Sequence, residues 1–232
     1  GRALINRQNM RHALPLSAVI QSSKILISPA SALTVIVLLA LGPQRPALRL
    51  TVLDVGQGLA AVVEAGGRVL VYDSGARYSD QFDMGRAVVL PYLQRRGYTE
   101  LDRLLISHAD NDHAGGYASL LAAFPHTKPM LPDELAAGPV VEPCQTAQQW
   151  QWGEVQLATL SNRGAGGRND NSCLLWVSWR GLRLLLPGDI ERAGERRLLA
   201  SGQLDAAATV LVAPHHGSKS SSGEPFVAAL KP

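Results

Sequence analysis

The stretch SHADNDHAGG, residues 107–116, decides how the rest of this chain is organised. An apolar run at residues 103–106 precedes it and predicts a buried strand, while residues 117–124 predict a helix. Four side chains of metal-binding type, His108, Asp110, Asp112 and His113, therefore fall in one strand-to-helix turn. Two imidazoles and two carboxylates this close together favour a divalent cation between them. The alternative is a polar loop in which Asp112 caps the helix, but a cap needs only one acidic residue.

Length and composition indicate a globular protein with a sizeable core. The chain has 232 residues, 46% of them hydrophobic, and a formal net charge of +3. This length suits one α/β domain, or one domain with an appendage. The weak positive charge permits a nucleic-acid partner, but no dense run of Lys and Arg indicates a dedicated DNA-binding tail.

The two cysteines, Cys144 and Cys173, are too few for a disulfide framework. They could pair if the domain faces an oxidising space. We favour the interpretation that they are unpaired, with Cys173 an ordinary apolar core residue.

Residues 1–47 differ from the rest of the chain. Residues 25–41 are almost wholly apolar, but the run is shorter than the roughly 20 residues of a spanning helix, and Pro29 interrupts it. It could be the end of a membrane region cut from a longer protein, a monotopic anchor, or an ordinary buried element. We favour the first interpretation. Pro43 and Pro46 then mark a linker into a second domain at residues 48–232.

From residue 48 the pattern predicts two β-rich halves, each followed by helix. Strands are expected at 48–55, 59–64 and 68–72, and a helix at 84–96. Residues 126–144 predict a long connection. A second group of strands is expected at 154–160, 172–179 and 183–186, then a helix at 191–199 and a strand at 209–213. Two such halves suggest two sheets face to face with helices outside.

Two later apolar strands also deliver possible ligands. Asp189 ends the sequence LLLPGD and is either a metal-bridging carboxylate or the N-cap of the next helix. His215 and His216 follow the strand at 209–213. Because adjacent side chains of a strand point to opposite sides, we expect one to bind metal and the other to contact substrate or pack. We assign His215 as the ligand.

Further polar residues could support the site or contact substrate. Asp73 could hydrogen-bond a metal-binding histidine. An Asx turn is the competing explanation for Asn171, and a flexible polar loop for Ser218 and Lys219. Turn geometry explains most of the role of the glycines next to Asp54 and Gln57. The full set of further polar residues is Asp54, Gln57, Asp73, Asn171, Ser218 and Lys219.

Four motifs in order resemble a known family. They are LDVGQG at 53–58, SHADNDHAGG at 107–116, LPGD at 186–189 and APHHGS at 213–218. The histidine-aspartate pattern is similar to the metal-binding signature of the metallo-β-lactamase superfamily, with Asp110 where a histidine is commoner. More narrowly, the set resembles the C-terminal domain of the ComEC family of competence DNA-uptake channels, over residues 48 to the end.

The resemblance implies an α+β fold, an αββα four-layer sandwich with the site at one edge of the two sheets. It implies a metal-dependent phosphodiesterase, a DNA nuclease that degrades the strand not taken up during natural transformation. It places the parent protein in the inner cell membrane, with this domain on the periplasmic or extracellular face. The expected partners are single-stranded DNA, the membrane through the N-terminal part of the parent, and other competence proteins. The family's domain continues past the position of Pro232, so we expect a chain truncated at its C-terminus.

The implied cofactor is a pair of divalent ions, Mn²⁺ or Zn²⁺. One ion is assigned to His108 and Asp110, with Asp189 bridging to the second. The ligands of the second ion are assigned as Asp112, His113 and His215. Asp112, Asp189 and His216 are expected to act in catalysis. Asp110 in place of an imidazole favours Mn over Zn, because carboxylates are harder ligands.

Three other functions stay open on the sequence. The same scaffold could hydrolyse a small ester, such as a lactone, a thioester or a phosphocholine ester. It could be a non-catalytic DNA-binding module, because one metal site has few ligands: between the first cluster and Asp189, only Asn169, Asp170 and Asn171 are candidates where many superfamily members supply a histidine. It could also be a structural domain next to the membrane that binds no metal.

Overall fold

The first sheet opens with the antiparallel meander that the sequence predicts and continues in parallel. Its strands follow one another in chain order, β1 (Leu48–Val52), β2 (Ala61–Ala65), β3 (Arg68–Tyr72), β4 (Arg103–Leu105), β5 (Lys128–Leu131) and β6 (Glu142–Pro143). The pairs β1–β2 and β2–β3 are antiparallel, whereas β3 to β6 run parallel. The carboxyl ends of β3 and β4 therefore meet at one edge of the sheet.

The structure is a computed structural model that describes residues 46–135, 142–144, 148–204 and 206–232. These residues belong to one unit, Arg45–Pro232. The predicted membrane-proximal segment, 1–47, lies almost wholly outside the described residues, so the domain boundary at residue 48 stays a prediction. No helix among the described residues has both the length and the apolar character needed to cross a bilayer.

The second sheet is antiparallel except at one end. It is ordered β11-β10-β9-β8-β7. The strands are β7 (Gln149–Trp152), β8 (Val155–Leu160), β9 (Leu174–Trp179), β10 (Leu182–Leu186) and β11 (Val210–Leu211). Among the described strands of this second sheet, only the pair β10–β11 is parallel. The residues that follow β10 and β11 therefore meet at one edge of this sheet, as those after β3 and β4 do in the first.

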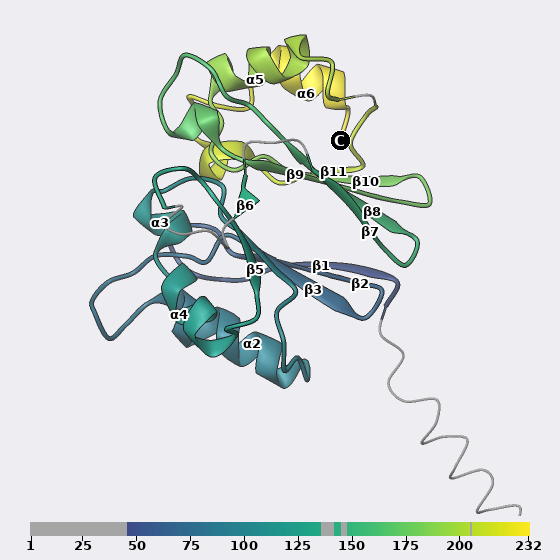
Figure 1. Ribbon diagram of the computed structural model, residues 1–232. Coiled ribbons are helices and arrows are strands. Elements are labelled where there is room, and N and C mark those ends of the chain that lie inside the picture. The colour runs from purple at the N-terminus through teal and green to yellow at the C-terminus, as the bar shows by residue number, and fades with distance from the viewer. Residues whose placement is uncertain (1–45, 136–141, 145–147, 205) are drawn as a thin grey trace, which may run out of the picture. The chain divides into compact units, whose positions relative to one another are not determined.

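The two sheets face each other and helices cover both outer faces (Figure 1). The helix pair α2 (Leu90–Arg95) and α4 (Tyr117–Ala123) covers the first sheet, with a π-helical turn, η2 (Gly85–Val89), leading into α2. The pair α5 (Arg192–Ala200) and α6 (Glu224–Leu230) covers the second. The predicted αββα sandwich is confirmed.

Three apolar layers hold these four structural layers together. Neighbouring residues of a strand point to opposite faces, so Leu105 packs between the sheets while Leu104 packs under the helices of the first sheet. In the second sheet Leu184 and Leu185 divide in the same way. Strands buried on both faces read as continuous apolar runs, which is why these runs were visible in the sequence.

The prediction of a long connection over residues 126–144 is wrong, because it contains β5 and β6. Pro129 lies inside β5, and a proline inside a short run argues against a strand when only the sequence is read. Here Pro129 is buried and pairs with Leu104 of β4. β7 was also not predicted, since its sequence QWQW is short and adjoins a glycine turn.

The expectation of unpaired cysteines is also wrong: Cys144 and Cys173 form a disulfide with a Cα–Cα distance of 5.8 Å. Cys144 directly follows β6 of the first sheet, and Cys173 directly precedes β9 of the second. The bond therefore ties the two sheets together inside their shared apolar layer. A separation of 29 residues gave no sign of this contact, because it depends on how the sheets face each other.

We predict that the double variant Cys144→Ala/Cys173→Ala is less stable than the wild type by about 3 kcal/mol, the size expected for losing a native cross-link that closes a loop of this length. Chemical denaturation of both proteins under oxidising conditions measures the difference. Adding a reductant should bring the wild type close to the variant. Equal stability of the oxidised wild type and the variant would contradict the cross-link.

Candidate metal centre

The candidate site lies where strands of both sheets end. The first sheet contributes Asp73 after β3 and the loop after β4, which leads into α3 (Asn111–Ala114). The second sheet contributes Asp189 after β10 and the histidine pair after β11. Because β3 and β4 are parallel, the two segments that follow them leave the first sheet at the same edge. The segments that follow the parallel strands β10 and β11 likewise share one edge of the second sheet.

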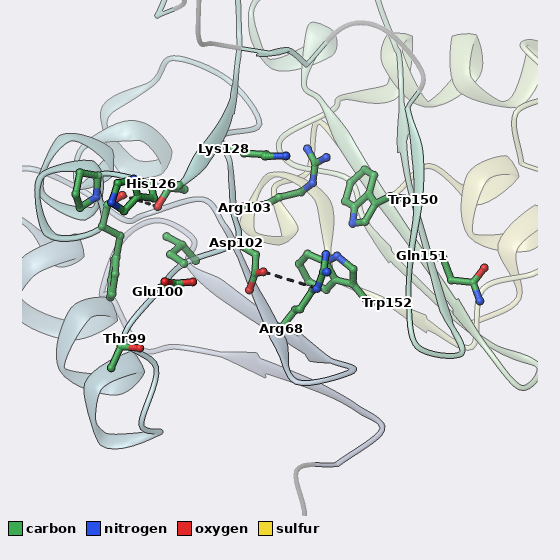
Figure 2. A pocket seen from close by; sticks show the side chains of 14 residues that line it. Arg68, Thr99, Glu100, Asp102, Arg103, His126, Lys128, Trp150, Gln151 and Trp152 are labelled. Atoms are coloured by element: carbon green, nitrogen blue, oxygen red, sulfur yellow. Dashed lines mark hydrogen bonds and ion pairs between the residues drawn. The ribbon is translucent and has the colours of Figure 1, made fainter.

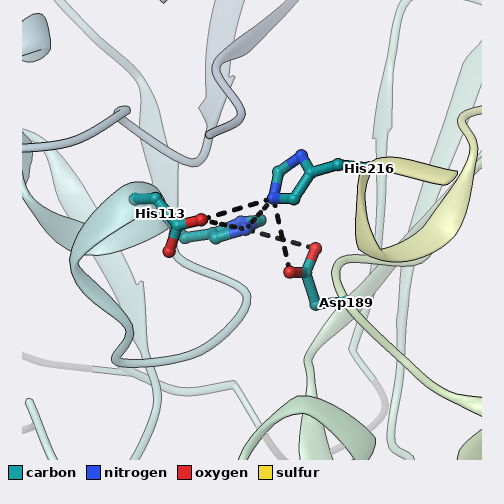
Figure 3. Close-up of side chains that lie close together, drawn as sticks. His113, Asp189 and His216 are labelled. Atoms are coloured by element: carbon teal, nitrogen blue, oxygen red, sulfur yellow. Dashed lines mark hydrogen bonds and ion pairs between the residues drawn. The ribbon is translucent and has the colours of Figure 1, made fainter. Parts of the chain in front are cut away.

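Four side chains converge there, and their possible ligand atoms all lie within 4.8 Å of one another: Asp112, His113, Asp189 and His216. We call them the four-residue cluster. Figure 3 shows His113 and His216 pointing toward each other beside Asp189. The Nε2 atoms of the two imidazoles are 3.0 Å apart. Each oxygen of Asp189 faces one imidazole, Oδ1 at 3.2 Å from His113 and Oδ2 at 3.4 Å from His216.

The chemistry of this donor set fits a divalent cation. Imidazole nitrogens and carboxylate oxygens are the ligands of zinc and manganese sites. Two facing Nε2 atoms at 3.0 Å cannot both be hydrogen-bond acceptors, so either a proton or a cation lies between them. Among the described residues, these four histidine and acidic side chains lie close enough together to hold a metal ion.

His113 is held in one orientation by Asp73. Its Nδ1–H donates to Asp73 Oδ2 at 2.8 Å, and both side chains are fully buried. Burial by itself lowers the pKa of His113, but the carboxylates of Asp73 and Asp189 outweigh it and raise the pKa to about 10. Burial by itself raises the pKa of Asp189, but the hydrogen bond and positive charge of His113 outweigh burial, so the pKa of Asp189 is lowered. Without a cation, the cluster is therefore stabilised by the proton on His113.

Asp73 is itself fixed from three sides, in the left-handed backbone region at φ 59°. Its Oδ1 accepts from the backbone N–H of Ser107 at 2.7 Å, and its Oδ2 accepts from the Ser107 hydroxyl at 2.9 Å. With His113 this makes three donors for one carboxylate. The sequence-based idea that Asp73 supports a metal-binding histidine corresponds to this contact with His113.

His108 lies beside the cluster with a free ring nitrogen. Since the Ser107 hydroxyl donates to Asp73, it accepts from His108 Nδ1–H at 2.9 Å. His108 Nε2 is buried and has no hydrogen-bond partner among the described residues. It lies 3.6 Å from Asp110 Oδ2. Burial lowers the pKa of His108, so the ring stays neutral and this nitrogen keeps the lone pair that a metal ligand needs.

The two adjacent histidines do not take the places that the sequence suggested. His215 Nδ1 contacts Ser220 Oγ at 3.0 Å and Glu191 Oε1 at 3.2 Å, and its Nε2 is 4.0 Å from Asp189. His216, not His215, joins the four-residue cluster. The argument from strand alternation does not apply, because both lie in the 3₁₀ turn η4 (Pro214–Gly217) with left-handed φ of 49° and 52°.

This backbone is costly for residues other than glycine, about 1–3 kcal/mol for each. Such strain persists only where the surroundings impose it. Here η4 is anchored at its start, since His215 N–H donates to Gly188 O and Ser221 Oγ donates to Pro214 O. The strained turn thus serves to direct His216 toward Asp189.

The remaining predicted residues lie around the cluster rather than in it. Asp54 Oδ1 accepts from its own turn at Gly56 N, and Gln57 is exposed. Asn171 lines a cavity of about 120 Å³ together with His108. Ser218 Oγ contacts Ser220 Oγ, and Lys219 is exposed. Asp54 is therefore engaged in its own turn.

Sequence reasoning missed several residues that shape the site. Ser107 joins Asp73 to His108, and Ser172 Oγ lies 3.5 Å from His108 Nδ1. Arg168 Nη1 lies 3.2 Å from Asp110 Oδ1. Gly58 lies against the loop at residues 107–116, which we call the metal loop, so closely that a Cβ there would lie 2.1 Å from the Asp112 carbonyl oxygen. The paired glycines of LDVGQG were the only signal for this approach.

A larger cavity, about 310 Å³, lies at the other end of the parallel strands (Figure 2). It is lined by the first residues of β3, β4 and β5, namely Arg68, Arg103 and Lys128. Arg103 is already paired with Glu142 at 2.7 Å and stacks on Trp150. None of the predicted site residues lines this cavity.

Comparisons with a family model and with curated proteins agree on the family to which this chain is similar. The family model described as the metallo-beta-lactamase superfamily matches residues 53–232. Recombination protein 2 of Haemophilus influenzae is 34% identical over 192 residues, which are 81% of this chain and 24% of that protein. Competence protein ComA of Neisseria gonorrhoeae is 34% identical over 185 residues, 78% of this chain and 26% of that protein. The chain thus spans about a quarter of the curated relatives it matches.

Among solved structures, a B3 metallo-beta-lactamase with an active-site glutamic acid superposes with a TM-score of 0.55 and 13% identity, covering 80% of this chain and 85% of that one. At this identity the likeness supports the fold alone. The resemblance inferred from the sequence is confirmed, because this chain has a metallo-beta-lactamase domain and relatives with competence names.

We predict that Asp73→Asn weakens divalent-metal binding about 10- to 100-fold, the usual effect of losing a partner that orients a ligand. The new amide would offer an N–H to His113 Nδ1 and move the ring proton to Nε2, which then cannot bind metal. Titration calorimetry with Mn²⁺ or Zn²⁺ measures the affinity.

Asp83→Asn is the matched control, because Asp83 is also buried but accepts from Arg86 N and Ser119 Oγ, away from any imidazole. Its metal affinity should equal that of the wild type. Equal losses in both variants would mean that Asp73 acts only through stability.

The raised pKa of His113 predicts a pH dependence of stability for the metal-free protein. Because the folded-state value of about 10 exceeds the ordinary value of 6.5, the stabilisation is complete below about pH 6.5 and is lost as pH rises toward 10. We expect the free energy of unfolding to fall by roughly 1–3 kcal/mol between pH 7 and pH 9. Denaturation of chelator-treated protein across this range is the measurement.

His113→Asn removes the titrating ring and keeps a donor for Asp73, so the slope between pH 7 and pH 9 should disappear in that variant. If the variant and the wild type show the same slope, other groups are responsible.

Proposed function

The chain belongs to the metallo-beta-lactamase superfamily, and from this premise we propose that residues 48–232 form a metal-dependent phosphodiesterase that cleaves DNA. The observation that carries the proposal is the convergence of Asp112, His113, Asp189 and His216 at strand ends of both sheets. The relatives with competence or recombination names support DNA as the substrate.

Two donor sets support a pair of ions. His108 and Asp110 are proposed to hold one, and Asp112, His113 and His216 the other. Asp189 is proposed as the bridging ligand, because its carboxylate faces His113 and His216 and also interacts electrostatically with His108. Two carboxylates in addition to Asp189 make the set oxygen-rich, which favours Mn²⁺ over Zn²⁺.

When bound, such ions supply Lewis-acid stabilisation of phosphate oxygens and lower the pKa of water. The chain's own residues do the positioning. Asp73 keeps the proton of His113 on Nδ1, so that Nε2 is directed at the cluster. Ser107 does the same for His108 through Nδ1. Both imidazoles are thus held in the tautomer that ligation requires.

Arg168 supports an anionic substrate over a neutral ester. Its guanidinium lies 3.2 Å from Asp110 Oδ1 and it lines the small cavity that also contains His108. A planar guanidinium beside a metal centre can bind a phosphate oxygen by charge-assisted hydrogen bonds. A neutral lactone or thioester would gain little from this residue.

The disulfide supports the proposed location on the periplasmic or extracellular face of the cell membrane. Disulfides persist in oxidising compartments and are rare in the cytosol. Cys144 and Cys173 are bonded within the core of the domain. We further propose that the domain acts on the DNA strand that is not taken up, within a longer membrane protein and alongside other competence proteins.

We predict that His216→Ala lowers Mn²⁺-dependent cleavage of single-stranded DNA at least about 100-fold, because it removes a ligand of the cluster. His215→Ala should retain most activity, since His215 faces Ser220 and Glu191 instead. Cleavage of a labelled oligonucleotide, with and without chelator, measures both. A larger loss from His215→Ala would reverse the assignment.

The same assay separates the competing functions. A DNA-binding module would retain the oligonucleotide without cutting it when Mn²⁺ is added. A small-ester hydrolase would cleave lactone or thioester substrates and leave DNA intact. Either result would overturn the nuclease proposal.

A further inference from the structure

A hairpin beside the metal centre carries two exposed aromatic rings. We call residues 77–83 the aromatic hairpin, because they turn back through an Arg77–Asp83 bridge and Tyr78 N–H donates to Phe82 O. Tyr78 is 56% exposed and Phe82 48%, and their ring centroids are 5.8 Å apart. Every other exposed large apolar side chain among the described residues is aliphatic.

The hairpin is fixed to the metal loop. Asn111 bonds the backbone of Arg77 on both sides, accepting from its N–H at 3.2 Å and donating to its C=O at 3.1 Å. Asn111 directly precedes Asp112 of the four-residue cluster. At Gly115, a Cβ would lie 2.1 Å from Arg77 N, so the two backbones are in direct contact. The rings therefore stand at a set position next to the cluster.

Folding alone does not explain this exposure. An aromatic side chain buries 150–250 Å² when covered and is a major source of stability, yet these two remain about half exposed on an ordered turn. The turn is held by its own contacts, with Ser79 N–H donating to Phe82 O and Arg77 paired with Asp80 at 2.7 Å. The rings are thus preorganised for a flat apolar partner.

We propose that Tyr78 and Phe82 stack on the bases of a single-stranded polynucleotide whose phosphate lies at the metal centre. The proposal rests on the proposed nuclease function and names its substrate class. Base–aromatic stacking tolerates any sequence, because every base has a flat π face. In a duplex the base faces are already stacked, so the hairpin selects unpaired strands.

The chemistry of the hairpin favours this occupant over a lipid surface. Asp80 at its tip is 96% exposed, and inserting the hairpin into a bilayer would take this carboxylate out of water, whereas stacking on bases leaves it solvated and paired with Arg77. Arg168, whose guanidinium lies 3.2 Å from Asp110 Oδ1, provides a cation for the backbone that connects the stacked bases. The rings for bases and the cation for phosphate thus both lie on segments that contact the loop at residues 107–116.

The test compares the wild type with Tyr78→Ala/Phe82→Ala on oligothymidylate and on an abasic strand with the same number of phosphates. We expect the double variant to raise KM for oligothymidylate about 10- to 100-fold with little change in kcat. The abasic strand should be cleaved alike by both proteins. Tyr78→Phe/Phe82→Tyr should restore the wild-type KM, because the rings return.

Leu182→Ala is the matched control, since Leu182 is also exposed but begins strand β10, at the opposite end from Asp189. Its KM should not change. The proposal is overturned if the double variant matches the wild type on oligothymidylate, or if the wild type handles the abasic strand equally well. It is also overturned if the variant loses binding to anionic vesicles and keeps its DNA kinetics.

Failure of the nuclease proposal would look different. The wild type would then cleave neither strand with Mn²⁺, and the hairpin would be tested by binding alone. Fluorescence anisotropy of labelled oligothymidylate with chelator-treated protein should still show weaker binding for the double variant than for the wild type. Equal binding would overturn the stacking role without any reference to cleavage.

Discussion

The site depends on one buried carboxylate. Asp73 directly follows β3, accepts two hydrogen bonds from Ser107 after β4, and accepts a third from the Nδ1–H of His113 in α3. A fully buried carboxylate is tolerable only with such compensation, so these contacts have to form together. Through Ser107 the same carboxylate also sets the proton on His108. One aspartate thus orients an imidazole in each of the two donor sets.

The fold makes this arrangement possible by placing carboxyl ends of parallel strand pairs at the same edge. β3 and β4 carry Asp73 and the histidine-aspartate loop, and β10 and β11 carry Asp189 and η4. Glycines let the segments approach, as at Gly58, where only a hydrogen atom fits against the Asp112 carbonyl. Neither sheet alone provides the four-residue cluster.

Much of this could be predicted from the sequence, for identifiable reasons. Buried strands such as β4 and β10 are continuous apolar runs, and the ligand pattern lies in a few consecutive residues, so both are local signals. The errors arose where the signal is not local. The choice between His215 and His216 depended on left-handed backbone in η4, and the Cys144–Cys173 bond depended on how two sheets meet. Strand β5 was not predicted because it contains Pro129, and the burial of this proline in a parallel sheet cannot be seen from its neighbours in sequence.

The division of the cluster between the sheets has a thermodynamic consequence. Asp112 and His113 follow a strand of the first sheet, and Asp189 and His216 follow strands of the second. Any ion shared by these residues would hold the two sheets together. The free energy of unfolding would then grow with the logarithm of free metal concentration, because ligands that bind only the folded state stabilise it by mass action. The supply of free metal would then set the stability of the domain as well as its chemistry.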